Sequence, residues 1–331
     1  MVGSPGEESL SVWLDVAPVS RDVVGGKGAS LSRLAALGAP VPLAFALTTH
    51  AYSLFAASHG LPCRASEVAD DDLPALRAQI VGAEIPLPVA DVIVDGYRAF
   101  QAEAGSDGVA LAVRSSATAE DSEAFSFAGL HDTVLDVRTL PALEAAVKQC
   151  WASLWSERAV VYRRAGGLAA DEAAIAVVVQ QLVRSDASFV VFTADPVGDR
   201  DGHLIIAATW GLGEAVVSGL VVPDHIVVDP KGQVVEYTVG DKHLMVIPGA
   251  RPEDGTREVP VPRALRTAPA LSNEQASAIA TMARDLAPRL GYEADLEGAF
   301  SADALYLFQA RPITTLNANG RARAIVAAGT D

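Results

Sequence analysis

Cysteine, long apolar runs and basic charge are all scarce in this sequence. Its 331 residues include two cysteines, too few for a disulfide framework or a thiolate metal site, which predicts a reducing, cytoplasmic setting. No apolar run reaches the roughly 20 residues of a membrane-spanning helix, and the N-terminus lacks a basic-then-apolar signal pattern. The 25 Lys and Arg against 41 Asp and Glu give a net charge of −16, which argues against general nucleic-acid or membrane binding.

Half of the residues are hydrophobic, enough for a large core divided over two or three lobes. An amphipathic pattern over 141–164 predicts one long helix with Arg163 at its solvent-exposed margin. Ser272, followed three residues later by Gln275, forms a capping box that predicts a helix running to about Leu290.

The central polar stretch begins where a short apolar run ends. Val109–Val113 predicts a buried strand, and Arg114, Ser115 and Thr118 follow it within VRSSATAED. An arginine at a strand exit is a permanently charged fork suited to phosphate oxygens, and the hydroxyl and N–H groups after it could line the same anion. The alternative is a solvated polar loop with a helix cap.

A glycine-rich segment, VGGKGASL at residues 24–31, lies just ahead of a predicted helix. Gly25 and Gly26 form the turn, and Lys27 lies at its mouth. Backbone N–H groups, the helix dipole and an ammonium group would converge there, as in a phosphate site. The spacing of a Walker A loop is absent, and a turn required only by backbone geometry is the alternative.

Two further strand ends suit a nucleotide. The apolar run 174–183 predicts a buried strand ending in Gln180, Gln181, Leu182 and Val183, a short polar hinge whose backbone groups can recognise the edge of a base. The strand over 204–208 ends in WGLGE, where Glu214 follows glycines in a turn like the earlier one.

Two alternating segments near the C-terminus predict a β-hairpin. With a three-residue turn centred on Asp303, Glu297 faces Gln309 and Asp295 faces Arg311, all on one face. Carboxylate and amide oxygens suit Mg²⁺, which usually binds together with nucleotide phosphates. An exposed, salt-bridged hairpin face is the alternative.

Together these motifs resemble the N-terminal nucleotide-binding domain of the pyruvate phosphate dikinase and phosphoenolpyruvate synthase family, to which rifamycin phosphotransferases and glucan water dikinases are related. They occur in the family's order and cover nearly the whole chain. The matching stretches are VGGKGASL at 24–31, VRSSATAED at 113–121, SFAG at 126–129, CWASLWSERAVVYR at 150–163, VVVQQLV at 177–183, FTADP at 192–196, WGLGEAVVSG at 210–219, PDHIVVD at 223–229 and DLEGAF…LYLFQARPIT at 295–314.

The resemblance implies an α+β, ATP-grasp-like fold with ATP held in a cleft between two lobes. It places the lobes at residues 1–185 and 186–316, with a tail or linker at 317–331. The residues that it assigns to ATP are Gly25, Gly26, Lys27, Arg114, Ser115, Thr118, Gln181, Leu182, Val183, Glu214, Glu297, Gln309 and Arg311. Within this set Lys27, Arg114 and Arg311 would be the catalytic clamps on phosphates, while Glu297 and Gln309 would bind Mg²⁺.

The resemblance also implies a dikinase-type phosphotransferase. It would pass the β-phosphoryl group of ATP to a histidine on a swivelling domain, releasing AMP and phosphate, for delivery to pyruvate or an antibiotic. None of the six histidines has the family's Thr-Ser-His-Ala setting, and the acceptor-binding domain is missing, so both are expected as partners on a separate chain or another part of this one. His131 is the one internal candidate acceptor. Phe189, where relatives usually carry a small residue, is expected to alter the nucleotide pocket.

Two alternatives to this function remain open. One is a self-contained kinase or ligase that acts directly on a small molecule in the same cleft. The other is a nucleotide-binding module without turnover.

Overall fold

The computed structural model describes residues 9–105, 108–118, 132–165, 174–196, 200–251 and 254–313. Within these residues the chain forms two compact units. The N-terminal unit runs to Arg184 and also includes Ile247–Arg257, and the C-terminal unit comprises Ser185–Val246 and the residues from Glu258 onward. The segment Ile247–Arg257, which lies within the second predicted lobe, therefore clusters with the first unit.

The N-terminal unit is built on a five-stranded antiparallel sheet in the order β1-β2-β5-β3-β4. The strands are β1 (Ser11–Trp13), β2 (Ala44–Leu47), β3 (Leu111–Ala117), β4 (Thr133–Val137) and β5 (Ile175–Gln181). β5 is the central strand, and its apolar residues are at most 1% exposed from Ile175 to Val179. Because both faces of this strand are covered, its sequence is a continuous apolar run rather than an alternating one.

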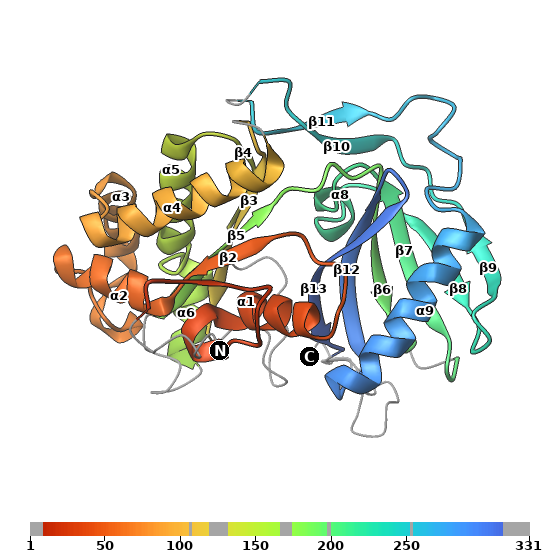
Figure 1. Ribbon diagram of the computed structural model, residues 1–331, viewed down its shortest axis with the longest axis horizontal. Helices are drawn as coiled ribbons and strands as arrows, with labels where there is room; N and C mark the ends of the chain where they lie inside the picture. The colour runs from red at the N-terminus through yellow and green to blue at the C-terminus, as the bar shows by residue number, and fades with distance from the viewer. Residues whose placement is uncertain are drawn as a thin grey trace, which may run out of the picture. The chain divides into compact units, whose positions relative to one another are not determined.

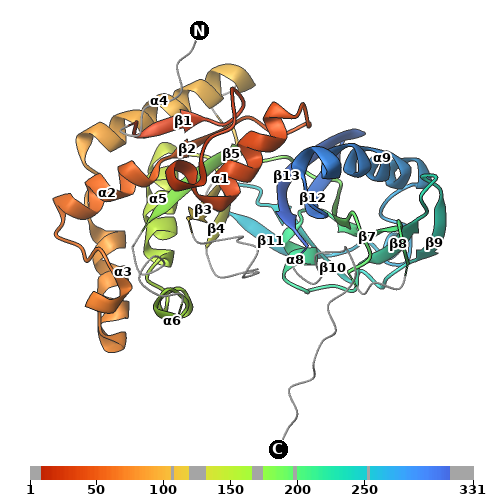
Figure 2. The same ribbon diagram turned by 90° about the horizontal axis from the view of Figure 1, so that it is seen from below.

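Helices cover both faces of this sheet (Figure 2). The α-helices are α1 (Arg21–Ala36), α2 (Thr49–Ser58), α3 (Leu73–Gly82), α4 (Leu87–Ala104), α5 (Leu140–Ser153) and α6 (Glu157–Ala165), with short 3₁₀ turns at Ala65–Glu67 and Asp70–Asp72. On one face α1 packs against β3 and β5, where Val24 and Leu31 meet Val178. On the other face α2 to α5 enclose the larger core.

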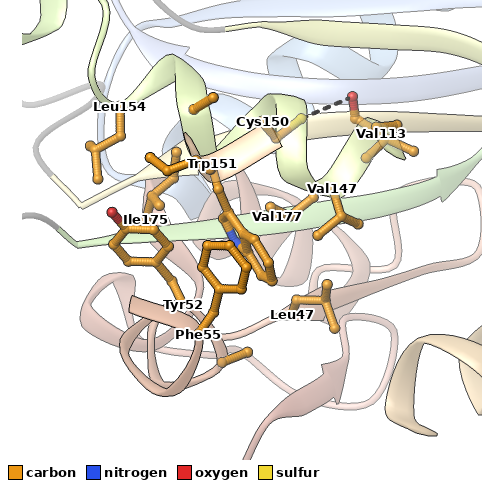
Figure 3. Packing of buried hydrophobic residues seen from close by; sticks show 14 of the residues in the cluster. Leu47, Tyr52, Phe55, Val113, Val147, Cys150, Trp151, Leu154, Ile175 and Val177 are labelled. Atoms are coloured by element: carbon orange, nitrogen blue, oxygen red, sulfur yellow. Dashed lines mark hydrogen bonds between the residues drawn. The ribbon is translucent and has the colours of Figure 1, made fainter. Parts of the chain in front are cut away.

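Trp151 of α5 lies in the middle of this larger core (Figure 3). Its ring centroid is 4.6 Å from that of Phe55 and 6.1 Å from that of Tyr52, and all three side chains are buried. Full burial of such side chains contributes about 1.5–3 kcal/mol each. The thiol of Cys150 points from the same helix toward the Val113 carbonyl of β3, at 3.7 Å.

The predicted single helix over 141–164 is wrong, because the chain forms two helices with a turn at 154–156 between them. Arg163 is also buried rather than marginal. Its guanidinium donates to the Leu154 carbonyl at 2.7 Å and lies 4.8 Å from the centroid of the Trp155 ring. The end of α5 supplies carbonyl groups that a continuous helix would use itself, and one of them draws the arginine inward.

The C-terminal unit contains a six-stranded antiparallel sheet in the order β13-β12-β6-β7-β8-β9. Its strands are β6 (Ala187–Phe192), β7 (Leu204–Trp210), β8 (Asp224–Val228), β9 (Val234–Thr238), β12 (Ala294–Ser301) and β13 (Ala304–Pro312), and the short helix α8 spans Glu214–Val217. Helix α9 (Asn273–Leu290) runs across one face of the sheet (Figure 1). Val191, Ile206 and Leu296, which lie on that face of the sheet, are each 0% exposed.

The predicted capping box of α9 is confirmed. The Gln275 N–H donates to Ser272 Oγ at 3.1 Å, and the Ser272 N–H donates to Gln275 Oε1 at 2.9 Å. The helix ends at Leu290, as predicted, and Gly291 follows in the left-handed conformation.

A buried ion pair anchors the segment that leads from β9 to α9. Asp224 on β8 and Lys242 form a salt bridge, and both side chains are 0% exposed. Asp224 also accepts hydrogen bonds from the N–H groups of Gly240 and Ala270 and from the Tyr237 hydroxyl. Since a buried carboxylate is costly unless its oxygens are satisfied, this set of bonds makes Asp224 a structural anchor.

Strands β10 (Leu244–Pro248) and β11 (Thr256–Pro260) form a separate two-stranded sheet. Near its tip the Gly249 N–H donates to Asp136 Oδ2 at 2.9 Å, and the Gly249 carbonyl accepts from Arg138 at 2.8 Å. Arg138 Nε in turn binds Asp136 Oδ1 at 2.6 Å. Asp136 holds a left-handed φ of 62°, which is uncommon for a residue other than glycine. These contacts are why the tip belongs to the N-terminal unit.

The predicted α+β class is confirmed, because both units combine helices with antiparallel sheets. Among the helices that the structure describes, none has the length and apolar character that crossing a bilayer requires.

Candidate functional site

The glycine-rich segment forms the first turns of α1 and breaks the helix at Gly25. Gly25 has φ 68° and ψ −178°, and an added Cβ there would lie 1.9 Å from the Ser116 carbonyl oxygen. Only glycine fits this position, so the turn lies directly on β3. The longer part of α1 starts at Gly26 and holds Lys27 in its first turn, where a helix favours anions. The glycines were predicted to lie ahead of the helix; the helix instead begins at Arg21, and the break at Gly25 creates a second helix start within it.

Lys27 joins the start of α1 to β3, which continues to Ala117 instead of ending at Val113 as predicted, so Arg114 lies within the strand and not at its exit. Its Nζ donates to the Ser115 carbonyl at 3.0 Å. The preceding residue, Arg114, is half-buried and lies opposite Val178, whose side chain packs under α1. Because cross-strand partners point to the same side, Arg114 shares a sheet face with the glycine turn. The structure therefore brings two predicted phosphate ligands to neighbouring positions.

Ser115 and Thr118 are placed differently from Arg114. The Ser115 hydroxyl donates to the Asp132 carbonyl at 3.0 Å, on the opposite face of β3, so only its backbone lies beside the glycine turn. Thr118 follows the strand, and its N–H donates to the Ala174 carbonyl at 3.5 Å. The rest of the predicted loop lies outside the described residues, namely Glu120, Asp121, the SFAG stretch at 126–129 and His131.

The predicted hinge follows β5. The Gln181 N–H donates to the Leu43 carbonyl at 2.9 Å, and the Leu182 N–H donates to the Ala110 carbonyl at 2.9 Å. Both N–H groups therefore serve the unit itself, so a base would have to contact these two residues through carbonyl oxygens or side chains. Val183, the third hinge residue, is half-buried.

Gln180 belongs to the predicted hinge stretch, but the resemblance assigned only the three residues after it to the nucleotide. Its side chain is buried, and its amide nitrogen has no hydrogen-bond partner within the part of the chain that the structure describes. It lies opposite Ala112 on β3, on the face of Arg114 and about 7–8 Å from it by sheet geometry. A buried amide without a partner costs about 1–3 kcal/mol, which a ligand acceptor would recover. The sequence feature that could have identified Gln180 is the pair of consecutive glutamines, but the sequence does not show which of the two faces α1.

Strands β12 and β13 form the predicted hairpin in the predicted register, which is confirmed. Glu297 lies opposite Gln309, and Asp295 lies opposite Arg311. Residues two apart on a strand point the same way, so all four side chains share one face of the sheet. It is the face opposite to the one that α9 covers.

The turn of this hairpin differs from the predicted one. It contains two residues, Ala302 and Asp303, with φ of 46° and 66°. A bulge then makes Phe308 an extra residue on β13 between the Glu297–Gln309 and Gly298–Leu307 pairs. The shorter turn and the extra residue compensate, so the register at the site is the one that a three-residue turn would give.

Charges on the hairpin face are paired with each other. Arg311 Nε donates to Asp295 Oδ2 at 2.8 Å, and Arg311 Nη2 lies 3.6 Å from Glu297 Oε1. The three side chains are between 9% and 18% exposed, and Gln309 is buried. Solvent therefore screens these charges less than it would on an open surface. The hairpin face is thus salt-bridged, as the alternative to a metal site expected, but it is largely buried rather than exposed.

The donor set restricts how a metal could bind. The described residues include no group of three or more His, Cys, Asp and Glu side chains that could hold a metal ion. The hairpin offers the carboxylate of Glu297 and, across from it, the amide oxygen of Gln309. Mg²⁺ usually takes one or two carboxylates and completes its shell with phosphates and water. The residues therefore fit Mg²⁺ together with a phosphate ligand.

Glu214, the first residue of α8, is exposed at the edge of the same sheet face. The turn before it packs on the sheet, since a Cβ on Gly213 would lie 3.6 Å from the Ser188 side chain. Ser188 is the cross-strand partner of Ala299, two residues from Glu297 on one face.

The expectation that Phe189 alters the nucleotide pocket is wrong for the hairpin face. Phe189 lies opposite Gly298 and points to the side covered by α9, away from Glu297. Its ring packs against Phe300, with centroids 6.2 Å apart.

Comparison with known proteins identifies the family of the chain. A family model described as "Pyruvate phosphate dikinase, AMP/ATP-binding domain" matches residues 21–329. A probable phosphoenolpyruvate synthase of Methanothermobacter thermautotrophicus is 36% identical over 95% of the chain and 47% of the relative. A rifampicin phosphotransferase of Streptomyces sviceus is 41% identical over 89% of the chain and 34% of the relative.

A third relative is the prodigiosin synthesizing transferase PigC of Serratia marcescens, 39% identical over 88% of the chain and 32% of the relative. The chain thus spans less than half the length of each of these relatives.

Proposed function

Because the chain belongs to the family of pyruvate phosphate dikinase AMP/ATP-binding domains, we propose that it binds ATP with Mg²⁺ and donates a phosphoryl group from it. The observation that carries the proposal is the hairpin register, which sets Glu297 against Gln309 and Asp295 against Arg311 on one face. Such a face offers oxygen ligands for a divalent cation beside a guanidinium for phosphate charge.

In the N-terminal unit, the proposed phosphate contacts are Lys27, Arg114 and the backbone at Gly25 and Gly26. Lys27 is held by the Ser115 carbonyl, a neutral acceptor, so this contact fixes the ammonium without cancelling its charge. Phosphoryl transfer depends mainly on positioning and on stabilising charge, which two cations beside a helix start would provide.

In the C-terminal unit, Arg311 is proposed to neutralise charge on the transferring group. The bond from its Nε to Asp295 fixes the plane of the guanidinium, which favours contact with planar or tetrahedral oxyanions at a defined angle. Glu297 and Gln309 would hold Mg²⁺, which supplies Lewis-acid stabilisation of the phosphate oxygens. Glu214 at the edge of this face is proposed as a further contact to the nucleotide.

The base and sugar are proposed to meet the end of β5 and the polar end of β3. Gln181, Leu182 and Val183 would offer carbonyl oxygens and side chains, and Gln180 its buried amide. Ser115 through its backbone and Thr118 complete the proposed set.

The proposed reaction splits ATP into AMP and phosphate and transfers the β-phosphoryl group to a histidine on a partner domain. The relatives' names point to different final acceptors, which supports an acceptor site outside the matched region. The histidine domain and the acceptor-binding domain are therefore proposed on a separate chain or on another part of this one. Pyruvate or an antibiotic would be the final acceptor.

The first test is thermal unfolding with and without MgATP. A ligand that binds only the folded state stabilises it by about 2.7 kcal/mol at a hundredfold excess over its dissociation constant. We expect a higher melting temperature with millimolar MgATP, and an unchanged one would contradict nucleotide binding. With β-³²P-ATP, label should appear on an added histidine-domain partner and AMP should be released, whereas stable label on the isolated chain would favour an internal acceptor such as His131.

A further inference from the structure

The Ser116 hydroxyl lies between β3 and the broken start of α1. Its side chain is 0% exposed. Oγ accepts a hydrogen bond from the Gly28 N–H at 3.1 Å and donates one to the Val24 carbonyl at 2.7 Å. In a regular α-helix this N–H and this carbonyl, four residues apart, bond to each other. One hydroxyl from the strand therefore serves both partners of the helical step that spans the break at Gly25.

This hydroxyl acts as a helix cap supplied from another element. A capping hydroxyl normally comes from the residue before the helix and is worth about 1 kcal/mol. Here the break at Gly25 creates a helix start inside α1, and the cap for its Gly28 N–H comes from β3. A side chain inserted into the helical ladder is a recognised cause of kinks.

The same contacts fix the position of the glycine turn along β3. A Cβ on Gly25 would lie 2.4 Å from Ser116 Oγ, so the turn rests on this side chain without a gap. Lys27, two residues further, reaches the Ser115 carbonyl. The turn and Lys27 are thereby held beside Arg114 at one position of the strand.

We propose that Ser116 is the positioning residue that holds the glycine turn and Lys27 in the geometry for phosphate binding, an inference that rests on the proposed binding of ATP. Ser116 itself needs no contact with the nucleotide. Its effect should be confined to the part of the ligand that the turn and Lys27 contact. Removal of the hydroxyl should weaken binding of MgATP and leave binding of adenosine, which has no phosphates, unchanged.

The test compares Ser116→Ala with Ser32→Ala by calorimetric titration of the whole chain with MgATP and with adenosine. Ser32 is a matched control on the same helix, because it is also 0% exposed, accepts from the Val19 N–H at 3.0 Å and donates to the Ala29 carbonyl at 3.0 Å. We expect Ser116→Ala to weaken MgATP binding about fivefold, the size of one lost capping interaction. Adenosine binding should not change in either variant, and MgATP binding should not change in Ser32→Ala.

Equal weakening of both ligands in Ser116→Ala, or no weakening of either, would overturn the positioning role. If Ser116→Ala does not fold, Ser116→Cys is the second variant, because a thiol has a similar shape and forms weaker hydrogen bonds. The positioning role again predicts weaker binding of MgATP with unchanged binding of adenosine. In a Lys27→Ala background the loss of the hydroxyl should weaken MgATP binding by less than about twofold, and an undiminished loss of about fivefold there would show that Ser116 does not act through Lys27. A wild-type chain that binds neither ligand would instead contradict the proposed function.

Discussion

The ring of Phe189 fills the space above Gly298 on the neighbouring strand. A Cβ on Gly298 would lie 2.5 Å from Phe189 Cζ and 2.4 Å from the Tyr306 carbonyl oxygen, distances that real Cβ atoms do not reach. The absence of a side chain at Gly298 thus makes room for the large ring of Phe189. The pair lies on the α9 side of the sheet, directly behind the face that carries Glu297.

Gly298→Ala should therefore destabilise the C-terminal unit although it adds a single methyl group. Overpacking of this kind typically costs about 1–3 kcal/mol, and here one of the two close atoms is backbone that cannot rotate away. Gly82→Ala is the matched control, since nothing lies within 4 Å of the position that its added methyl group would take. Denaturant unfolding measures the free energy of unfolding of both variants. A Gly298→Ala chain as stable as the control would show that the two strands are looser than described.

Glu297→Gln should impair Mg²⁺-dependent phosphoryl transfer more than it impairs nucleotide binding. The substitution keeps the shape of the side chain and removes the charge that faces Mg²⁺ and Arg311. We expect at least about a tenfold loss of turnover, since even groups behind metal ligands typically contribute 10–100-fold. Asp285→Asn, an exposed member of an ion pair on α9, is the control. Full activity of Glu297→Gln over a Mg²⁺ titration would remove this residue from the metal site.

Gln180→Met should weaken ATP binding without lowering stability. Methionine has a similar length and fills the same space, but it cannot donate a hydrogen bond. Loss of one such bond to a ligand corresponds to about a threefold to tenfold weaker affinity. In the free protein, the change removes a buried amide that lacks a partner among the described residues, so the melting temperature should hold or rise. A lower melting temperature with unchanged affinity would make Gln180 a structural residue.

Stability should fall at alkaline pH partly through Cys150. Burial raises the pKa of this thiol well above its usual value, so the folded state keeps the proton where the unfolded state has lost it. The unfolding free energy is then undiminished below about pH 8.5 and falls above it, by as much as about 1.4 kcal/mol per pH unit. Compared between pH 7 and 10, the wild type should lose more stability than Cys150→Ala. If the unfolding free energies of the wild type and Cys150→Ala fell in parallel with pH, the thiol would not contribute to the loss of stability.

The hairpin shows how far the sequence alone can lead. Alternation of polar and apolar residues fixes which side chains share a face, so the pairing of Glu297 with Gln309 was predictable. The turn was not, because Ala302 and Asp303 adopt positive φ without the glycine or asparagine that usually marks it. The bulge at Phe308 has no sequence signal either, and the correct register came from two deviations that cancel.

Elsewhere the site depended on contacts between distant segments, which periodicity does not reveal. The helical segment that follows the break at Gly25 was predictable from leucine spacing and glycine chemistry, whereas the helical turn before it, from Arg21, was not. That Ser116 rather than Ser115 meets this turn depends on which face of β3 is packed against α1, a choice made by the whole sheet. For the same reason the sequence does not show whether Gln180 or Gln181, at the end of β5, faces α1.

The assignment of Ile247–Arg257 to the N-terminal unit has a consequence for synthesis on the ribosome. A nascent chain that has emerged only as far as Arg184 already contains Asp136 and Arg138 but not Gly249, which shares hydrogen bonds with both. The unit that begins first is therefore completed only after Ser185–Val246 has been translated. Until then the Asp136 carboxylate and the Arg138 guanidinium, both nearly buried, can bond only to each other. Early release of the N-terminal segment should therefore yield an incomplete domain that is not stable by itself.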